Sequence, residues 1–290
     1  MTTDPHPPHL KIIECPRDAM QGLHDYINTK DKIRYLQQLL AVGFDSLDFG
    51  SFVSPKAIPQ MRDTRQVVEA LDLSQSDTSL LAIVANERGA RDACEYDQIE
   101  YLGYPFSISE TFQLRNTNAT IAESLDRVKT VQELCQKSVK KLVIYISMGF
   151  GNPYGDYWGV EVVQEWVDVL YDLDIGYFQL SDTIGVARPD SIEYLFSNFL
   201  PTYPDIEIGA HFHTTAETWY EKIDTAYKNG CTRYDGTIKG FGGCPMAQND
   251  LVGNMPSENL ILYASSNGLE TGLDLDAYAR AVRIALEILY

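Results

Sequence analysis

Short apolar runs alternate with longer segments of helical periodicity along most of the chain. Leu10–Cys15 and Phe44–Phe49 have the length and composition of strands. Between them, Lys30–Val42 carries leucines at helical spacing and ends at a glycine. The same alternation continues to the C-terminus, where Leu275–Tyr290 is predicted to be the last helix. This pattern predicts repeated strand–helix units, which are typical of proteins with a parallel sheet.

Eight strands are predicted in total. The other six are Ser79–Val84, Tyr101–Phe106, Lys141–Ile146, Gly176–Leu180, Ile206–His211 and Arg233–Gly236. The other predicted helices are Thr64–Leu73, a segment ending at Asp97, Thr120–Gln136, Val160–Leu173, Pro189–Phe199, Ala216–Asn229 and Ser257–Ser266. Eight alternating units in 290 residues predict a TIM (β/α)8 barrel with a short C-terminal helical extension.

A doubly wound open sheet is the second possibility, but no Gly-x-Gly-x-x-Gly follows the first strand. The composition shows no linker-like shift, so residues 10–290 are predicted to form a single domain. Residues 1–9 are rich in proline and histidine and are predicted to be a disordered tail.

The overall charge narrows the possible partners. The chain has 41 acidic and 23 basic residues, a net charge of −18, which argues against nucleic acid and anionic membranes as partners. No apolar run approaches the roughly 20 residues that span a bilayer, and the N-terminus lacks a signal-peptide pattern. The five cysteines contain no Cys-x-x-Cys pair, which favours reduced thiols. We therefore expect a cytoplasmic protein.

His211 and His213 are the strongest metal-binding signal. Residues two apart in a strand point to the same face, so both imidazoles can reach one ion. An ordinary hydrogen-bonded histidine pair is the alternative. Oxygen ligands elsewhere would favour Mg²⁺ or Mn²⁺, whereas a cysteine ligand would favour Zn²⁺.

Charged side chains also follow three of the predicted strands, at the end of a barrel where active sites form. Arg17 and Asp18 follow the first strand; an arginine can stabilise an enolate oxygen, and an aspartate can bind a hard cation. The alternative for this pair is a surface ion pair. Asp48 ends the second strand, and Asp182 follows the sixth. Asp182 is a candidate base or supporting residue, or a cap for the next helix.

Two loops complete the candidate site. Ser51 and Lys56 lie in a small-residue loop that can line a pocket for a phosphate-bearing acyl tail, although such lysines are often only solvated. Cys244 lies between glycines and a proline, which favours a loop thiol active in proton transfer over an inert buried one. Asn254 can give an amide oxygen to a metal or cap the following helix.

The motifs PRDAMQ, SFVSPKAIPQM, SDTIGV, HFH, GFGGCPMAQ and GNMPSENL occur in this order. Their order resembles the hydroxymethylglutaryl-CoA lyase family, part of a wider group of barrel metallolyases that includes isopropylmalate and homocitrate synthases. The resemblance runs from about Lys11 to Leu260. The RD and HxH elements are shared across that group, whereas SFVSPK and GGCP are particular to the lyases.

The resemblance implies a Claisen-type cleavage of 3-hydroxy-3-methylglutaryl-CoA into acetyl-CoA and acetoacetate. It also implies a homodimer. It implies that Mg²⁺ or Mn²⁺ is bound by Asp18, His211, His213 and Asn254. Arg17 would polarise the thioester carbonyl, and Cys244 would transfer a proton. Asp182 and Glu258 would be polar groups around that thiol, with Glu258, Ser51 and Lys56 on the substrate side.

Several positions depart from the family pattern. The first motif, Glu14–Gln21, is one residue short and lacks both glycines. Asp48 stands where the family has a catalytic glutamate, and Thr214 replaces an aspartate. One extra residue after GGCPMAQ leaves both Asn249 and Asn254 as candidate ligands. These changes leave open a lyase for another 3-hydroxyacyl-CoA or a 4-hydroxy-2-oxo acid, and a non-catalytic metal-binding barrel.

Overall fold

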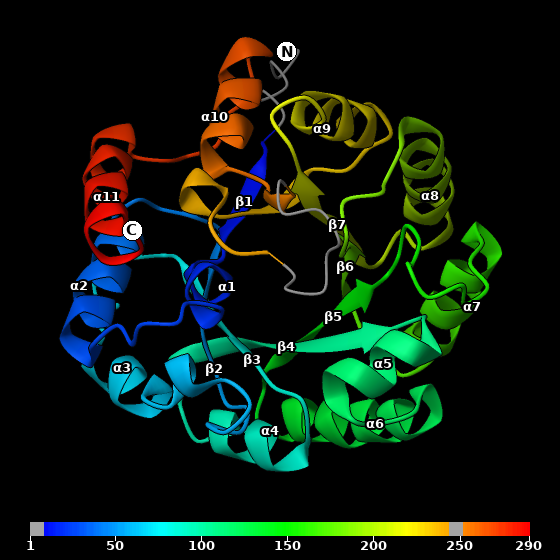
Figure 1. Ribbon diagram of the computed structural model, residues 1–290, viewed down its shortest axis with the longest axis horizontal. Coiled ribbons are helices and arrows are strands. Elements are labelled where there is room, and N and C mark those ends of the chain that lie inside the picture. The colour runs from blue at the N-terminus through cyan, green and yellow to red at the C-terminus, as the bar shows by residue number, and fades with distance from the viewer. Residues whose placement is uncertain (1–8, 244–251) are drawn as a thin grey trace, which may run out of the picture.

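Eight parallel strands close into a barrel in the computed structural model, which describes residues 9–243 and 252–290 (Figure 1). Neighbouring strands follow the order β6-β5-β4-β3-β2-β1-β8-β7, and pairing of β6 with β7 closes the ring. The strands are β1 (Lys11–Glu14), β2 (Ser46–Ser51), β3 (Ser79–Ile83), β4 (Ile99–Ser107), β5 (Lys141–Ser147), β6 (Tyr177–Asp182), β7 (Glu207–Thr214) and β8 (Arg233–Gly236). The predicted TIM barrel and its eight strands are confirmed.

Helices surround the barrel, as Figure 1 shows. Local capping marks where they begin: Thr120 and Glu123 form a capping box at α6, and Asn28 accepts a hydrogen bond from the Asp31 amide at α2. The predicted helices are confirmed as α2 (Thr29–Leu40), α3 (Thr64–Ala70), α4 (Glu87–Cys94), α6 (Ile121–Lys137), α7 (Val160–Tyr171), α8 (Pro189–Thr202), α9 (Trp219–Lys228), α10 (Ser257–Ser266) and α11 (Leu275–Ile288).

Three short elements were not predicted from the sequence: α1 (Pro16–Gln21), α5 (Glu110–Thr117) and β9 (Gly253–Asn254). The α1 helix has six residues, too few for a helical period to appear. Pro16 starts it at a position where a missing N–H costs no hydrogen bond. Two 3₁₀ turns, η1 (Pro59–Met61) and η2 (Ile238–Gly240), complete the elements of the described residues.

The barrel interior is packed with side chains, so the ends of the barrel are the places where a site can form. Part of this packing is a buried cluster from three neighbouring strands: Leu81, Ile83, Tyr101, Val143 and Tyr145. A larger apolar layer lies between the strands and the helices. At the amino end of the strands, Glu207 forms ion pairs with Lys11 and Arg233, both at 2.7 Å. The polar residues predicted to be functional follow the opposite ends of the strands.

Some predictions lie outside the described residues: residues 1–8 of the predicted tail, Cys244 and Asn249. Within residues 9–243 and 252–290, the structure contains no helix of the length and hydrophobicity that a membrane crossing requires.

Candidate metal centre and active site

Four predicted metal ligands lie within the described residues, and they meet at the carboxyl ends of the strands. Asp18 lies on α1 just after β1, and His211 and His213 lie on β7. The β9 strand pairs antiparallel with β7 and sets Asn254 opposite His213. One ligand atom each from Asp18, His211 and His213 lie within 4.8 Å of one another. Residues more than 190 positions apart in sequence therefore form one donor set.

The hydrogen bonds of this set suit a divalent cation. The Asn254 amide group donates to Asp18 Oδ2 at 2.8 Å and to the Phe241 carbonyl at 2.9 Å. Within the described residues, Asn254 Oδ1 and His213 Nδ1 are buried and have no hydrogen-bond partner. Buried polar atoms without a partner cost free energy, and cation binding would satisfy them. A carboxylate, an amide oxygen and imidazoles fit Mg²⁺ or Mn²⁺.

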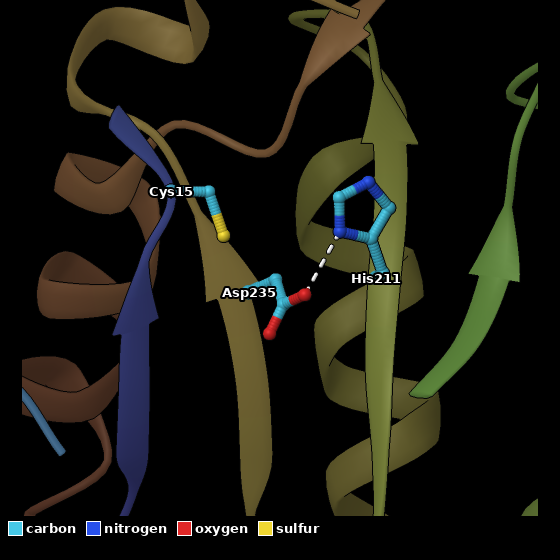
Figure 2. A group of neighbouring side chains, drawn as sticks. All are labelled: Cys15, His211 and Asp235. Atoms are coloured by element: carbon cyan, nitrogen blue, oxygen red, sulfur yellow. Dashed lines mark hydrogen bonds and ion pairs between the residues drawn. The ribbon is translucent and has the colours of Figure 1, made fainter. Parts of the chain in front are cut away.

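The two histidines differ in charge state. Burial and repulsion from His211 lower the pKa of His213 to about 3, so its ring stays neutral and able to bind a cation. Burial also acts to lower the pKa of His211, but the hydrogen bond and charge of Asp235 outweigh it and raise that pKa. His211 Nδ1 lies 2.9 Å from Asp235 Oδ2 (Figure 2). Donation from Nδ1 to this carboxylate leaves the Nε2 lone pair for a metal.

Asp235, on β8, was not identified from the sequence. Its side chain is 1% exposed, and its second oxygen accepts a hydrogen bond from Gln179. Its contacts with Gln179 of β6 and His211 of β7 place its side chain among inward-facing groups of the barrel. The one signal in the sequence that could have identified it is a carboxylate within a predicted strand, because a buried charged side chain is nearly always paired.

Replacing Asp235 with asparagine is expected to weaken Mn²⁺ binding by about 10- to 100-fold. The neutral amide oxygen is a weaker acceptor for the His211 Nδ1–H than the carboxylate, so it orients the ring less firmly. Calorimetric titration with Mn²⁺ measures the change. Asp45→Asn is the matched control, because Asp45 pairs with Arg233 at 3.4 Å at the amino ends of the strands, away from the donor set. Unchanged affinity in Asp235→Asn would contradict the orienting role.

Arg17 is held rigidly beside the donor set. Its Nε and Nη2 donate to Asp48 at 3.0 and 2.5 Å, and its Nη1 donates to Asp18 and Gln21, both at 2.9 Å. One of its five N–H groups, on Nη2, has no partner among the described residues. The Arg17 and Asp18 side chains are each 10% exposed. The alternative of a surface ion pair is therefore wrong.

Asp48 is completely buried against Arg17. Burial raises the pKa of Asp48 to about 6, although Arg17 acts in the opposite direction. The Asp48 carboxylate thus reaches the guanidinium with both oxygens. Its main structural effect is to fix the plane of Arg17.

Asp182 forms a buried ion pair with Lys222 of α9, at 2.5 Å. Burial raises the pKa of Asp182, with Lys222 opposing the shift. Lys222 also donates to the backbone carbonyl of His213 at 2.8 Å, so the pair supports β7 beside the donor set. The residue that caps α8 is Arg188, so the alternative of Asp182 as this cap is wrong. A catalytic role for Asp182 stays a prediction.

The three residues predicted to bind substrate lie outside this donor set. The Ser51 hydroxyl donates to the Ile83 carbonyl at 3.1 Å, which uses it within the fold. Lys56 is exposed, and Glu258 accepts from the backbone amide of Lys239 at 3.0 Å. Their roles toward substrate stay predictions, as does the proton transfer assigned to Cys244.

Glu14 is a further buried carboxyl group, at the end of β1. It accepts hydrogen bonds from the Ile238 amide at 2.7 Å and the Ser257 hydroxyl at 2.5 Å. These two partners lie on either side of the segment that contains Asn254. Burial raises the pKa of Glu14 to about 8, so it is protonated at neutral pH.

The stability of the protein is expected to fall as pH rises from about 4.5 to about 8 because of Glu14. In this window the folded state holds a proton that the unfolded state has lost, which lowers the free energy of unfolding by at most about 1.4 kcal/mol per pH unit. Glu14→Gln mimics the protonated form and should remove this component. Thermal unfolding across the pH range tests it, with exposed Glu133→Gln as control. Parallel pH profiles for Glu14→Gln and the parent would refute it.

Comparison with known proteins decides the family, because the HMGL-like family model matches residues 10–284. The chain belongs to the HMGL-like family. It is 33% identical to hydroxymethylglutaryl-CoA lyase YngG of Bacillus subtilis, covering 96% of this chain and 93% of that protein. It is 30% identical to the (R)-citramalyl-CoA lyase of Chloroflexus aurantiacus, with coverage of 92% and 86%.

A solved structure agrees with this assignment. The HMG-CoA lyase of Acinetobacter baumannii, in complex with coenzyme A and 3-methylmalate, superposes with a TM-score of 0.89 at 30% identity, covering 97% of this chain and 91% of that one. These relatives are carbon–carbon lyases, and this chain is an enzyme of that class. The family depends on a divalent metal ion, which fits the donor set. The resemblance to the hydroxymethylglutaryl-CoA lyases is confirmed.

Proposed function

We propose that this enzyme cleaves 3-hydroxy-3-methylglutaryl-CoA into acetyl-CoA and acetoacetate with Mg²⁺ or Mn²⁺. The observation that carries the proposal is the position of Arg17, which touches Asp18 of the donor set. In this set Asn254 Oδ1 and His213 Nδ1 lack partners among the described residues. An anchored guanidinium beside a cation site suits a reaction that develops negative charge on oxygen. The similarity to the lyases of Bacillus subtilis and Acinetobacter baumannii supports the substrate.

The reaction begins with loss of the proton from the tertiary hydroxyl group of the substrate. The electrons of that O–H bond form the ketone of acetoacetate while the carbon–carbon bond breaks, and the bonding pair moves into the enolate of acetyl-CoA. Protonation of the enolate carbon completes the reaction. Cys244 is the predicted thiol for this proton transfer. When bound, Mg²⁺ or Mn²⁺ supplies a Lewis acid that favours ionisation of the hydroxyl group.

Arg17 has a defined task in this scheme. Its free Nη2 N–H can donate to the thioester oxygen, where the charge of the enolate develops. Asp48 and Gln21 hold the guanidinium in place before substrate arrives, so little reorganisation is needed in the transition state. His211 is oriented in the same way by Asp235.

The test is a product assay on the purified protein. With Mg²⁺ or Mn²⁺ present, 3-hydroxy-3-methylglutaryl-CoA should yield equal amounts of acetyl-CoA and acetoacetate, both measured by liquid chromatography and mass spectrometry. Chelation of the metal should stop product formation, and added metal should restore it. A protein that binds Mn²⁺ but releases no product from this substrate would refute the assignment.

A related substrate, citramalyl-CoA, is the second candidate. The similarity to a citramalyl-CoA lyase favours this substrate. Asp48 also favours it, because the family resemblance implies a longer glutamate at this position. A comparison of kcat/KM for the two thioesters decides between them. The homodimer and the cytoplasmic location stay predictions, and sedimentation of the purified protein tests the former.

A further inference from the structure

Cys15 brings a thiol beside His211 that the metal donor set does not use. It directly follows β1 and is 1% exposed. Among the described residues its sulfur has only one weak hydrogen bond, to the Ile13 carbonyl at 3.9 Å. Ligand atoms of Cys15, His211 and Asp235 all lie within 4.8 Å of one another. Figure 2 shows the sulfur directed toward Asp235, with the bonded ring nitrogen of His211 on the same side.

Two donor sets therefore meet at one imidazole. The outer set contains Asp18 and His213, and the inner set contains Cys15 and Asp235. In Figure 2 the two ring nitrogens of His211 point in different directions, with Nδ1 toward Asp235. A neutral imidazole has one N–H and one lone pair, so it can bind a cation through only one nitrogen at a time.

The chemistry of the two sets differs. The outer set offers oxygen and imidazole atoms, which suit Mg²⁺ and Mn²⁺, whereas the inner set adds a thiolate, which suits softer cations. Zinc sites hold sulfur at about 2.3 Å and nitrogen and oxygen at about 2.0–2.2 Å from the ion. Around a tetrahedral ion such bond lengths place the ligand atoms roughly 3.4–3.6 Å apart. His211 Nδ1 and Asp235 Oδ2, now 2.9 Å apart, must therefore separate by side-chain rotation to admit the ion.

We propose that Cys15, His211 and Asp235 form a second metal site, selective for thiophilic divalent cations such as Zn²⁺ and Cd²⁺, that competes with the Mg²⁺ or Mn²⁺ site for His211. On binding, the ion replaces the proton of the Cys15 thiol and takes the Nδ1 lone pair. The imidazole proton then resides on Nε2, and one proton leaves to solvent. The outer set loses its His211 ligand.

The consequence for activity rests on the function proposed above. A thiophilic cation in the inner site would inhibit the lyase by removing a ligand from the catalytic metal. Binding in the inner site itself does not depend on any activity, so the two ideas can be tested separately.

The direct test is titration of the metal-free protein with Cd²⁺, followed by the ultraviolet thiolate-to-cadmium charge-transfer band. The parent and the Cys244→Ala variant should both show a band that is missing in Cys15→Ser. Cys94, Cys135 and Cys231 are present in all three proteins and act as internal controls. A band of equal intensity in Cys15→Ser and the parent, or no band in the parent, would overturn the proposal.

A competition experiment tests the shared imidazole. With Mn²⁺ bound and monitored by electron paramagnetic resonance, Cys15→Ser should require at least about tenfold more Zn²⁺ than the parent to release Mn²⁺. Cys15→Ala should behave like Cys15→Ser, and thermal unfolding of both variants checks that they are folded. Equal Zn²⁺ requirements in the parent and both variants would overturn the competition. Lack of lyase activity in all proteins would refute only the proposed function.

Discussion

Replacing Arg17 with lysine is expected to lower kcat of the proposed lyase reaction by about 100- to 1,000-fold, equivalent to about 2.7–4 kcal/mol of transition-state stabilisation. The guanidinium meets both oxygens of Asp48 and also donates to Asp18 and Gln21. A lysine ammonium lacks this planar arrangement of donors, so it cannot keep the contact with Asp48 and also face the thioester oxygen. Steady-state kinetics at saturating metal measures the loss.

A surface arginine gives the control for this substitution. Arg65 forms ion pairs with Asp92 and Glu95 at 2.8 and 3.4 Å, and Arg65→Lys should leave kcat unchanged. Arg17 also contacts Asp18, so Arg17→Lys can slow the enzyme by weakening metal binding or by weakening stabilisation of the enolate. An unchanged Mn²⁺ affinity excludes the first explanation. An enzyme that keeps full kcat with lysine at position 17 would exclude Arg17 as the group that stabilises the enolate.

Replacing Lys222 with methionine is expected to destabilise the protein by about 3–5 kcal/mol. The substitution leaves the Asp182 carboxylate buried without its cation, and it removes the donor to the backbone carbonyls of Gly185 and His213. Because burial already raises the pKa of Asp182, protonation of this group at acid pH should reduce the loss. Chemical denaturation at neutral and acid pH measures both effects.

The same helix offers a matched control. Lys228 of α9 pairs with Asp224 at 2.7 Å while 70% exposed, so Lys228→Met should cost no more than about 1 kcal/mol. Adding Asp182→Asn to Lys222→Met should recover part of the stability, since it removes the unpaired charge. Equal losses for Lys222→Met and Lys228→Met would show that the buried pair has no special importance. If folded Asp182→Asn protein keeps its activity, Asp182 is not the catalytic base.

The fold was largely predictable because its signals are local. Each strand of the barrel is a short apolar run, and each long helix has a repeating apolar face, so alternation alone indicates a parallel barrel. The α1 and β9 elements escaped prediction for a physical reason. With six and two residues they have no period of their own, and each forms through contacts made elsewhere in the fold.

The site was predictable in part. His211 and His213 share a face because they are two apart in a strand, and Asp18 follows a strand whose end must meet the same rim. The sequence could not reveal that Asp235 orients His211, or that Asp48 and Asp18 both hold Arg17. The contacts of Asp235 with His211 and of Asp48 with Arg17 join residues from different elements, and their distances depend on the closure of the barrel.

The sequence by itself determined the type of fold, the family motifs and the residue types available for chemistry, because periodicity and motif spacing are properties of neighbouring residues. The tertiary structure decided which of those residues meet, since parallel strands far apart in sequence end at one rim. It decided that Asn254 Oδ1 and His213 Nδ1 have no hydrogen-bond partner within residues 9–243 and 252–290. It also decided that Cys15 lies beside His211, because β1 and β7 both adjoin β8 in the closed barrel.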